Sequence, residues 1–176
     1  MDKVVFFDRD GVINVEKNYL HKIEDFEFID SSFSSFKYLK KLGYKFVIIT
    51  NQSGIDRGKY SIEDFNILTD WMLEQFKEHD ITIEVVNYCP HHPDFSGDCE
   101  CRKPKIGMIK QVEDILNIDY KNSWLVGDKD SDIGAAKNAN IANTIQVRSG
   151  HSFDEETSKA QFIIDSINDI SNIIKE

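Results

Sequence analysis

Short apolar runs recur along the chain and alternate with longer segments in which apolar residues follow a helical spacing. The first run, residues 4–7, is apolar throughout and too short for a helix, as is typical of a strand buried on both faces of a sheet. Strands are expected at residues 4–7, 46–49, 83–88, 124–126, 144–147 and 162–164. Helices are expected at residues 32–42, 62–76, 106–116, 132–139 and 167–174. This alternation predicts an α/β fold with a mostly parallel sheet and helices on both faces.

Polar residues and a glycine mark the ends of several of these helices. Ser61 with Asp64 resembles a capping box, and Ser131 can cap the helix that follows it. Gly43 stands where a left-handed C-terminal cap is expected. No tract rich in Pro, Gly or Ser divides the chain, so we expect a single domain over residues 1–176.

Acidic residues outnumber basic ones, with 31 Asp and Glu against 21 Lys and Arg and a net charge of -10. This charge disfavours non-specific attraction to nucleic acid or to an anionic membrane, so neither is an expected partner. The sequence shows no signal-peptide pattern and no apolar run long enough to span a bilayer, which favours a cytoplasmic protein. No apolar stripe is left without a place in one domain, so a monomer is expected.

All three cysteines of the chain lie in one stretch, in the motifs Cys-x-His and Cys-x-Cys. An odd number of cysteines in a reducing compartment argues against a disulfide framework, although small buried cysteines are the plain alternative. Three cysteines and one histidine can bind zinc tetrahedrally. The predicted zinc ligands are Cys89, His91, Cys99 and Cys101, with His92 as the competing histidine. Because all four ligands come from the protein, the zinc would be structural and would fix a loop within residues 89–101.

Acidic and polar residues follow three of the expected strands. In chain order they are Asp8, Asp10, Thr50, Asn51, Asp128 and Asp132. Each could belong to an ordinary polar turn, but their joint placement at the strand ends, where open α/β sheets bind ligands, favours a functional site. Together with Lys103, this pattern resembles the haloacid dehalogenase-like (HAD) phosphohydrolases. The resemblance implies the Rossmann-like fold of that superfamily.

The HAD resemblance also implies a division of chemical work. Asp8 would be the nucleophile that forms an aspartyl phosphate, and Asp10 would protonate the leaving oxygen and then deprotonate the attacking water. Mg²⁺ would be bound by Asp8, Asp128 and the backbone carbonyl of Asp10. Thr50 and Lys103 would hold the oxygens of the transferred group.

A basic run, residues 102–105, follows the cysteines in this net-acidic chain. Because a guanidinium group matches phosphate geometry, Arg102 is expected to bind substrate phosphate. Arg57, Asn51 and Lys129 are further candidates for substrate binding, although an exposed lysine is the plain alternative for Lys129.

Many HAD enzymes carry a cap domain between the first and second motifs or between the second and third. Here the first interval holds one helix, and the second holds one helix, one strand and the zinc loop. We therefore expect a capless enzyme with an open site and the zinc loop as a partial wall.

The chain contains the stretches DRDGVIN, HKIEDFEFID, TNQSGIDRGKYS, YCPHHP, CRKPKIGM and VGDKDSDIGAAK. They are similar to those of the D-glycero-D-manno-heptose 1,7-bisphosphate 7-phosphatase family, over nearly the whole chain up to Gly150. The resemblance implies a sugar bisphosphate substrate whose 7-phosphate is removed, on the way to nucleotide-activated heptose for lipopolysaccharide or another surface glycan. The loop between His91 and Cys99 is short, and Ile106 stands where many relatives have proline. The shorter loop leaves open how the distal part of the sugar is held and which anomer is preferred.

Two alternatives stay open. A histidinol-phosphate phosphatase shares the DRDG, zinc-loop and CRKP motifs, but a bisphosphate needs a second anion site, and Arg57 favours the bisphosphate. A non-catalytic, zinc-stabilised binding module is the alternative from another class, and the intact acids with Lys103 argue against it.

Overall fold

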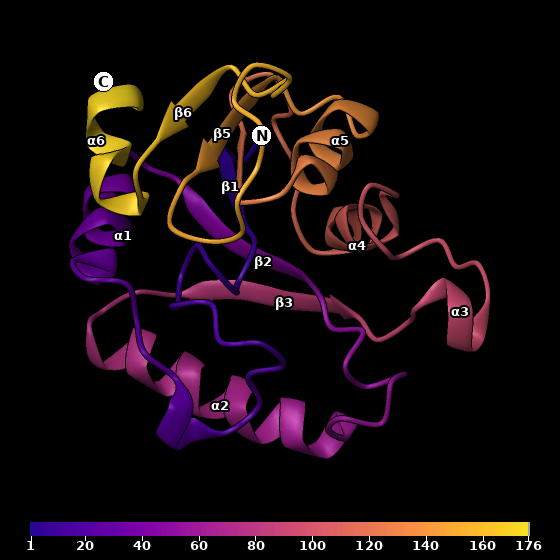
Figure 1. Ribbon diagram of the computed structural model, residues 1–176. Helices are drawn as coiled ribbons and strands as arrows, with labels where there is room; N and C mark the ends of the chain where they lie inside the picture. Colours follow the sequence, from indigo (N-terminus) through magenta and orange to yellow (C-terminus); the bar gives the residue numbers. More distant parts are fainter. Residues whose placement is uncertain (176) are drawn as a thin grey trace.

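The computed structural model describes residues 1–175 as a six-stranded sheet with helices on both faces (Figure 1). Glu176, the last residue of the expected domain, lies outside the described residues. The strands are β1 (Val4–Phe7), β2 (Lys45–Asn51), β3 (Ile83–Cys89), β4 (Trp124–Gly127), β5 (Asn143–Val147) and β6 (Phe162–Ile164). The α-helices are α1 (Ser32–Lys41), α2 (Ile62–Glu78), α3 (Pro93–Ser96), α4 (Gly107–Lys110), α5 (Asp130–Asn138) and α6 (Ile170–Ile173). The strand order is β3-β2-β1-β4-β5-β6 with every neighbouring pair parallel, which confirms the predicted α/β class.

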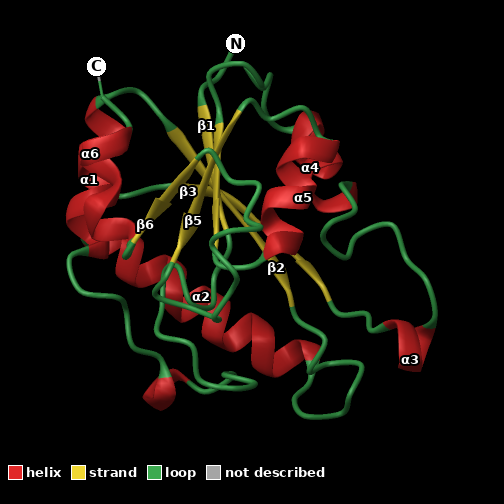
Figure 2. Ribbon diagram, turned by 45° about the horizontal axis from the view of Figure 1, so that its top comes forward, coloured by secondary structure: helices red, strands yellow, loops and turns green. Residues whose placement is uncertain are grey.

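Alternate residues of β1 face two separate cores. Val5 and Phe7 pack in the core that lies under α1, α2 and α6, whereas Val4 and Phe6 pack in the core under α4 and α5. Figure 2 shows these two groups of helices on opposite sides of the sheet. All four side chains are fully buried, which explains why the run is apolar at every position.

The predicted helix ends are confirmed at α1 and α2. Ser61 and Asp64 form both hydrogen bonds of a capping box, and Gly43 has a φ of +81° directly after the end of α1. The prediction that Ser131 caps α5 is wrong, because Ser131 lies inside the helix. The carboxylate of Asp132 instead accepts hydrogen bonds from the backbone N–H groups of Asp128 and Lys129.

Three predicted boundaries differ from the structure. The expected helix at residues 106–116 is α4 followed by a 3₁₀ segment, Gln111–Asp114, and the terminal helix likewise begins with a 3₁₀ segment, Ile167–Asp169. Apolar spacing identified the buried face correctly, since Val112 is fully buried, but it does not distinguish an α-helical turn from a 3₁₀ turn. Thr50 and Asn51, expected in a loop, are the last residues of β2.

The order of the strands changes direction beside β1, with β2 and β3 on one side and β4, β5 and β6 on the other. In open α/β sheets the crevice at the carboxyl ends of such strands is where ligands bind. The segments between β1 and α1 and between β2 and β4 contribute to the same layers, and residues 1–175 include no added cap domain. Among the described helices, none has both the length and the apolar character needed to cross a membrane.

Phe36→Ala is expected to lower the free energy of unfolding by about 3–5 kcal/mol, because it removes a buried ring and leaves a cavity. The Phe36 ring has no exposed surface and packs edge-on against Phe46 and Phe76, each with 4.9 Å between ring centroids. Urea denaturation followed by circular dichroism measures the loss. Ile67→Ala is the control, since Ile67 is 54% exposed on α2 and its loss should cost less than about 0.5 kcal/mol. Equal losses for the two variants would contradict the assigned core.

Candidate active site

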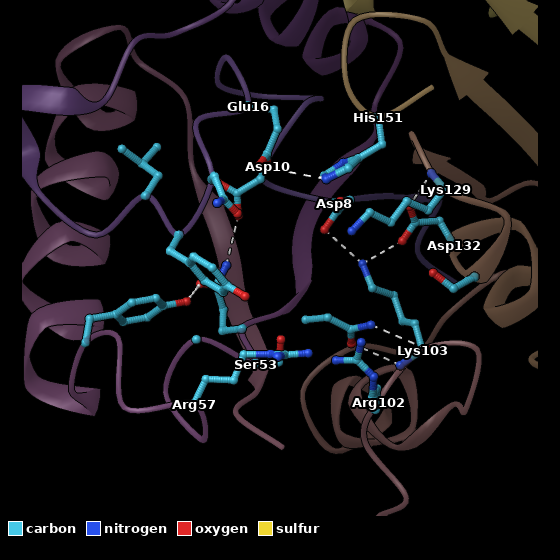
Figure 3. A pocket seen from close by; sticks show the side chains of 18 residues that line it. Asp8, Asp10, Glu16, Ser53, Arg57, Arg102, Lys103, Lys129, Asp132 and His151 are labelled. Atoms are coloured by element: carbon cyan, nitrogen blue, oxygen red, sulfur yellow. Dashed lines mark hydrogen bonds and ion pairs between the residues drawn. The ribbon is translucent and has the colours of Figure 1, made fainter. Parts of the chain in front are cut away.

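A pocket of about 350 Å³ lies at the carboxyl ends of the central strands (Figure 3). It gathers residues from distant parts of the chain. Most of the predicted site residues line it, namely Asp8, Asp10, Asn51, Arg57, Arg102, Lys103 and Lys129. Thr50 and Asp128 lie beside them, almost completely buried at the ends of β2 and β4.

The ammonium group of Lys103 lies at the centre of a buried ionic cluster. Its Nζ atom is 2.9 Å from Asp8 Oδ1 and 2.7 Å from Asp132 Oδ1. It also donates a hydrogen bond of 2.7 Å to the backbone carbonyl of Ile49 on β2. The three acceptors therefore come from the ends of β1 and β2 and from α5, and Lys103 joins them.

The charges in this cluster do not balance, because three acids, Asp8, Asp128 and Asp132, lie close together with one lysine. Burial raises the pKa of the Asp8 carboxyl well above its usual value. Lys103 opposes this shift, and the negative charges of Asp132 and Asp128 add to it. Burial lowers the pKa of Lys103, but the carboxylates of Asp132 and Asp8 outweigh burial and raise it. A divalent cation near these acids would relieve the excess negative charge.

The donor atoms of the cluster fit a metal ion. Oxygen atoms of Asp8, Asp128 and Asp132 all lie within 4.8 Å of one another. The two oxygens of Asp132 are already engaged, by Lys103 and by two backbone N–H groups. Asp128 Oδ1, in contrast, is buried without a hydrogen-bond partner. Asp8 and Asp128 are therefore the acids best able to bind Mg²⁺, an ion that prefers oxygen ligands.

The second acid, Asp10, lies in a different environment. Its carboxylate accepts hydrogen bonds from Arg9 at 3.0 and 3.2 Å, from Asn14 at 3.1 Å and from Gln52 at 3.0 Å. Burial alone would raise the pKa of Asp10, but Arg9 and these hydrogen bonds outweigh burial and lower it. Two acids one residue apart thus have pKa values shifted in opposite directions, a pattern typical of sites that divide proton transfer from another task.

Gln52, which sequence reasoning missed, connects the ends of β1 and β2. Its amide nitrogen donates to Asp10 and, at 2.9 Å, to the hydroxyl of Thr50, while Tyr60 donates to its amide oxygen. Thr50 was expected to contact the transferred group and here accepts this hydrogen bond. Asn51 accepts a hydrogen bond of 3.0 Å from the backbone N–H of Lys103, so it also holds the segment that carries the lysine.

The basic residues form the outer wall of the pocket. Arg57 donates to His92 Nε2 at 2.8 Å and lies over the Phe95 ring, 5.5 Å from its centroid. Arg102 donates to the backbone carbonyl of His91 at 3.3 Å. Both guanidinium groups are therefore tied to the predicted zinc loop, whereas Lys129 extends into the pocket from the other side (Figure 3).

The three cysteines are close together, as the zinc prediction requires. The sulfur atoms of Cys89 and Cys101 each lie 3.7 Å from that of Cys99. The thiols form a possible metal-binding group, but neither histidine belongs to it among the described residues. Both ring nitrogens of His92 make hydrogen bonds, whereas His91 uses only Nδ1, which is 3.2 Å from Ser96 Oγ. His91 thus keeps one nitrogen available for a metal ion.

Glu16 and His151 also line the pocket and were not predicted. His151 Nδ1 is 2.7 Å from Asp128 Oδ2, and its Nε2 is 3.8 Å from Glu16. No strand, helix cap or known spacing marks either residue in the sequence. His151 also follows Gly150, beyond which the family resemblance weakens.

Several known proteins are similar to this chain over most of its length. The family model described as polynucleotide kinase 3 phosphatase matches residues 3–164. The D-glycero-beta-D-manno-heptose-1,7-bisphosphate 7-phosphatase of Pasteurella multocida is 43% identical over 180 residues, which cover 99% of this chain and 98% of the relative. The D-glycero-alpha-D-manno-heptose-1,7-bisphosphate 7-phosphatase of Photorhabdus laumondii is 49% identical over 163 residues, which cover 90% of this chain and 89% of the relative.

Solved structures share the fold. A D,D-heptose 1,7-bisphosphate phosphatase from B. bronchiseptica, complexed with magnesium and phosphate, has a TM-score of 0.81 at 23% identity and covers 97% of this chain and 96% of its own. A HAD-like phosphatase from Mesorhizobium loti has a TM-score of 0.82 at 28% identity, and the match covers 96% of this chain and 84% of its own. The parallel sheet and its acid-rich edge therefore define a HAD-like phosphatase. The chain belongs to the polynucleotide kinase 3 phosphatase family and, within it, to the D-glycero-D-manno-heptose 1,7-bisphosphate 7-phosphatases.

Asp8→Asn is expected to raise the melting temperature of the metal-free protein near neutral pH by roughly 2–4 °C, the shift that about 1 kcal/mol produces in a chain of this size. The folded-state pKa of Asp8 is raised, so the metal-free protein loses stability as pH rises above the unfolded pKa of about 3.9. Asparagine carries no such penalty, and Lys103 keeps its ion pair with Asp132. The gain should vanish as pH falls to about 4.

Thermal melts in the presence of a chelator, repeated across this pH range, measure the effect. Asp25→Asn is the control, because Asp25 is exposed and lies away from the cluster. A lower melting temperature for Asp8→Asn at neutral pH would show that the Asp8–Lys103 ion pair outweighs the burial of the carboxylate.

Proposed function

We propose that this protein is a Mg²⁺-dependent phosphatase that removes the 7-phosphate of D-glycero-D-manno-heptose 1,7-bisphosphate and leaves the 1-phosphate. The product would enter the synthesis of nucleotide-activated heptose for lipopolysaccharide or another surface glycan. The observation that carries the proposal is the 41–49% identity, over nearly the whole chain, to relatives that bear this activity in their names. The same proposal assigns the reaction to a monomer in the cytoplasm.

In the proposed mechanism the two acids at the end of β1 take different roles. A carboxylate oxygen of Asp8 attacks phosphorus, the bond to the sugar oxygen breaks, and an aspartyl phosphate forms. Asp10 gives a proton to the departing sugar oxygen and then takes one from the water that attacks the aspartyl phosphate. That second displacement releases phosphate and restores both carboxyl groups. In the metal-free protein the pKa of Asp8 is raised and that of Asp10 is lowered, which is opposite to what a nucleophile and a general acid need. A bound Mg²⁺ beside Asp8 would favour its ionised form.

The groups around phosphorus would stabilise the charge of the transferred phosphoryl group. Lys103, whose Nζ is 2.9 Å from Asp8 Oδ1, would bind oxygens of the transferred phosphoryl group, with Thr50 as a further donor. The residues that would hold Mg²⁺ are Asp8, Asp128 and the backbone carbonyl of Asp10. The ion would neutralise the negative charge that phosphate and carboxylates bring together. The magnesium and phosphate in the B. bronchiseptica structure support this choice of ion.

The outer part of the pocket would bind the rest of the sugar bisphosphate. Arg57 and Arg102 lie on one side and Lys129 lies on the other, and Asn51 also lines the pocket. These cations suit a second phosphate group better than the ammonium of histidinol phosphate. The two relatives described above carry names that specify opposite anomers, so the anomer must be found by assay.

We further propose that Cys89, His91, Cys99 and Cys101 bind a structural Zn²⁺. The clustered thiols support the three sulfur ligands, and the available ring nitrogen of His91 supports it over His92. Four protein ligands leave no open position, so the zinc would hold the loop in shape and take no part in the reaction.

Purified protein with Mg²⁺ is expected to hydrolyse heptose 1,7-bisphosphate with a kcat/KM at least about 10-fold above that for histidinol phosphate, a difference of about 1.4 kcal/mol in transition-state stabilisation. Both anomers are tested by phosphate release, and Asp8→Asn should fall to the rate of the buffer blank. A clear preference for histidinol phosphate would overturn the substrate assignment. Failure to release phosphate from any sugar phosphate would favour the non-catalytic binding module.

Cys99→Ser and His91→Ala are expected to lose the bound zinc during desalting, whereas His92→Ala should retain it. Each of the first two variants removes a ligand, and a three-ligand site binds zinc more weakly. Metal analysis by mass spectrometry gives the zinc content per chain. If His92→Ala loses zinc and His91→Ala keeps it, the fourth ligand is His92. Unchanged content in Cys99→Ser would mean that the cysteines are only buried.

A further inference from the structure

The carboxylate of Asp128 is tightly enclosed by backbone. Two glycines, Gly11 and Gly150, lie against it, and its side chain has no exposed surface. A Cβ atom on Gly150 would overlap the carboxylate, and one on Gly11 would lie 2.7 Å from Asp128 Oδ2 and 2.6 Å from the Cα of Gly150. Only residues without a side chain fit at these two positions. We call Gly11, Gly150 and His151 the Asp128 cradle.

His151 binds one oxygen of this carboxylate twice. Its backbone N–H donates to Asp128 Oδ2 at 2.7 Å, and its ring Nδ1 lies 2.7 Å from the same atom. Since an ionised carboxylate can only accept, Nδ1 carries the proton in this contact. The other oxygen, Oδ1, is buried and has no hydrogen-bond partner among the described residues. Both donors therefore act on the same oxygen and leave Oδ1 available.

The segment that carries His151 is fastened to the loop after β1. The hydroxyl of Ser149 donates to the backbone carbonyl of Gly11 at 2.7 Å. On the far side of the ring, His151 Nε2 lies 3.8 Å from Glu16 (Figure 3). The hydrogen bond of Nδ1 with Asp128 thus orients the imidazole ring, although the ring is 42% exposed at the pocket wall.

We propose that His151 is a positioning residue that fixes the rotation of the Asp128 carboxylate so that Oδ1 faces the bound Mg²⁺. The inference rests on the proposed function, because it concerns the metal site of the same reaction. Partners that orient metal ligands commonly change metal affinity by about 10–100-fold when removed. Loss of the Nδ1 donor would leave only the backbone N–H on Oδ2, and the carboxylate could rotate about its Cβ–Cγ bond.

Three substitutions at this position separate the donor from the bulk of the ring. His151→Ala removes the donor. His151→Asn places an amide N–H at the same number of bonds from Cβ as Nδ1, whereas His151→Gln moves it one bond further out. The probe is Mn²⁺ alone, with free ion measured by electron paramagnetic resonance. Ser152→Ala is the matched control, since Ser152 is exposed on the same segment.

The Mn²⁺ dissociation constants of His151→Ala and His151→Gln are expected to rise about 10-fold, and that of His151→Asn less than about 3-fold. The same order should hold for the Mg²⁺ concentration that gives half-maximal phosphate release, with kcat largely regained at saturating Mg²⁺. The inference is overturned if His151→Ala binds Mn²⁺ as the unchanged protein does, or if His151→Asn is as weak as His151→Ala. It also fails if Asp128→Asn leaves Mn²⁺ binding unchanged.

The metal-binding measurement is independent of the substrate. If the protein does not hydrolyse heptose bisphosphate but His151→Ala weakens Mn²⁺ binding, the proposed function fails and the role of His151 stands. If hydrolysis is confirmed but His151→Ala and the unchanged protein have equal Mn²⁺ dissociation constants, only the role of His151 fails. Circular dichroism of each variant checks the fold, and should His151→Ala unfold, the comparison of His151→Asn with His151→Gln decides the question.

Discussion

The buried ammonium of Lys103 is the point on which the site depends. It reaches the acids of β1 and α5 and a carbonyl of β2. Without it the Asp8 carboxylate would lose its ion pair, and Asp132 would keep only its two backbone N–H donors. A buried carboxylate without a partner is strongly unfavourable. The lysine itself comes from the segment just after the predicted zinc ligands, and Asn51 holds its backbone. The catalytic edge and the zinc loop are therefore joined through one side chain.

The same cluster explains why neighbouring acids behave differently. Asp8 faces Lys103 in a group with excess negative charge, whereas Asp10 turns toward the buried guanidinium of Arg9, which is 1% exposed. The backbone at the end of β1 directs the two side chains to different partners. In the proposed reaction this separation lets one carboxylate bond to phosphorus while the other transfers protons. The protein is acidic as a whole, but Arg57, Arg102 and Lys129 are gathered at this pocket. Their local positive charge would favour an anionic substrate.

Local patterns in the sequence predicted the features that depend on local physics. The strands were recognisable because burial on both faces makes each run apolar, and Asp8, Asp10 and Asp128 follow from their places at strand ends. Gln52 and His151 were missed because their roles come from contacts with residues 42 and 23 positions away, which only the folded sheet brings together. The cap of α5 was misassigned for a similar reason. Ser131 is a good local cap, but the carboxylate of Asp132 already occupies the backbone donors at that helix start.

Without a cap domain, selection of the substrate has to come from loops that are already in place. The loop after β2 lines the pocket and contacts the zinc loop. Asp56 accepts hydrogen bonds from the backbone of His92 and from the Ser96 hydroxyl, and Arg57 contacts His92 and Phe95. Preformed contacts of this kind spare the entropy of ordering a loop on binding. In the proposed function, a shortened zinc loop would therefore change the support of Arg57 beside the sugar, whereas the hydrogen-bond partners of Asp10 lie outside that loop.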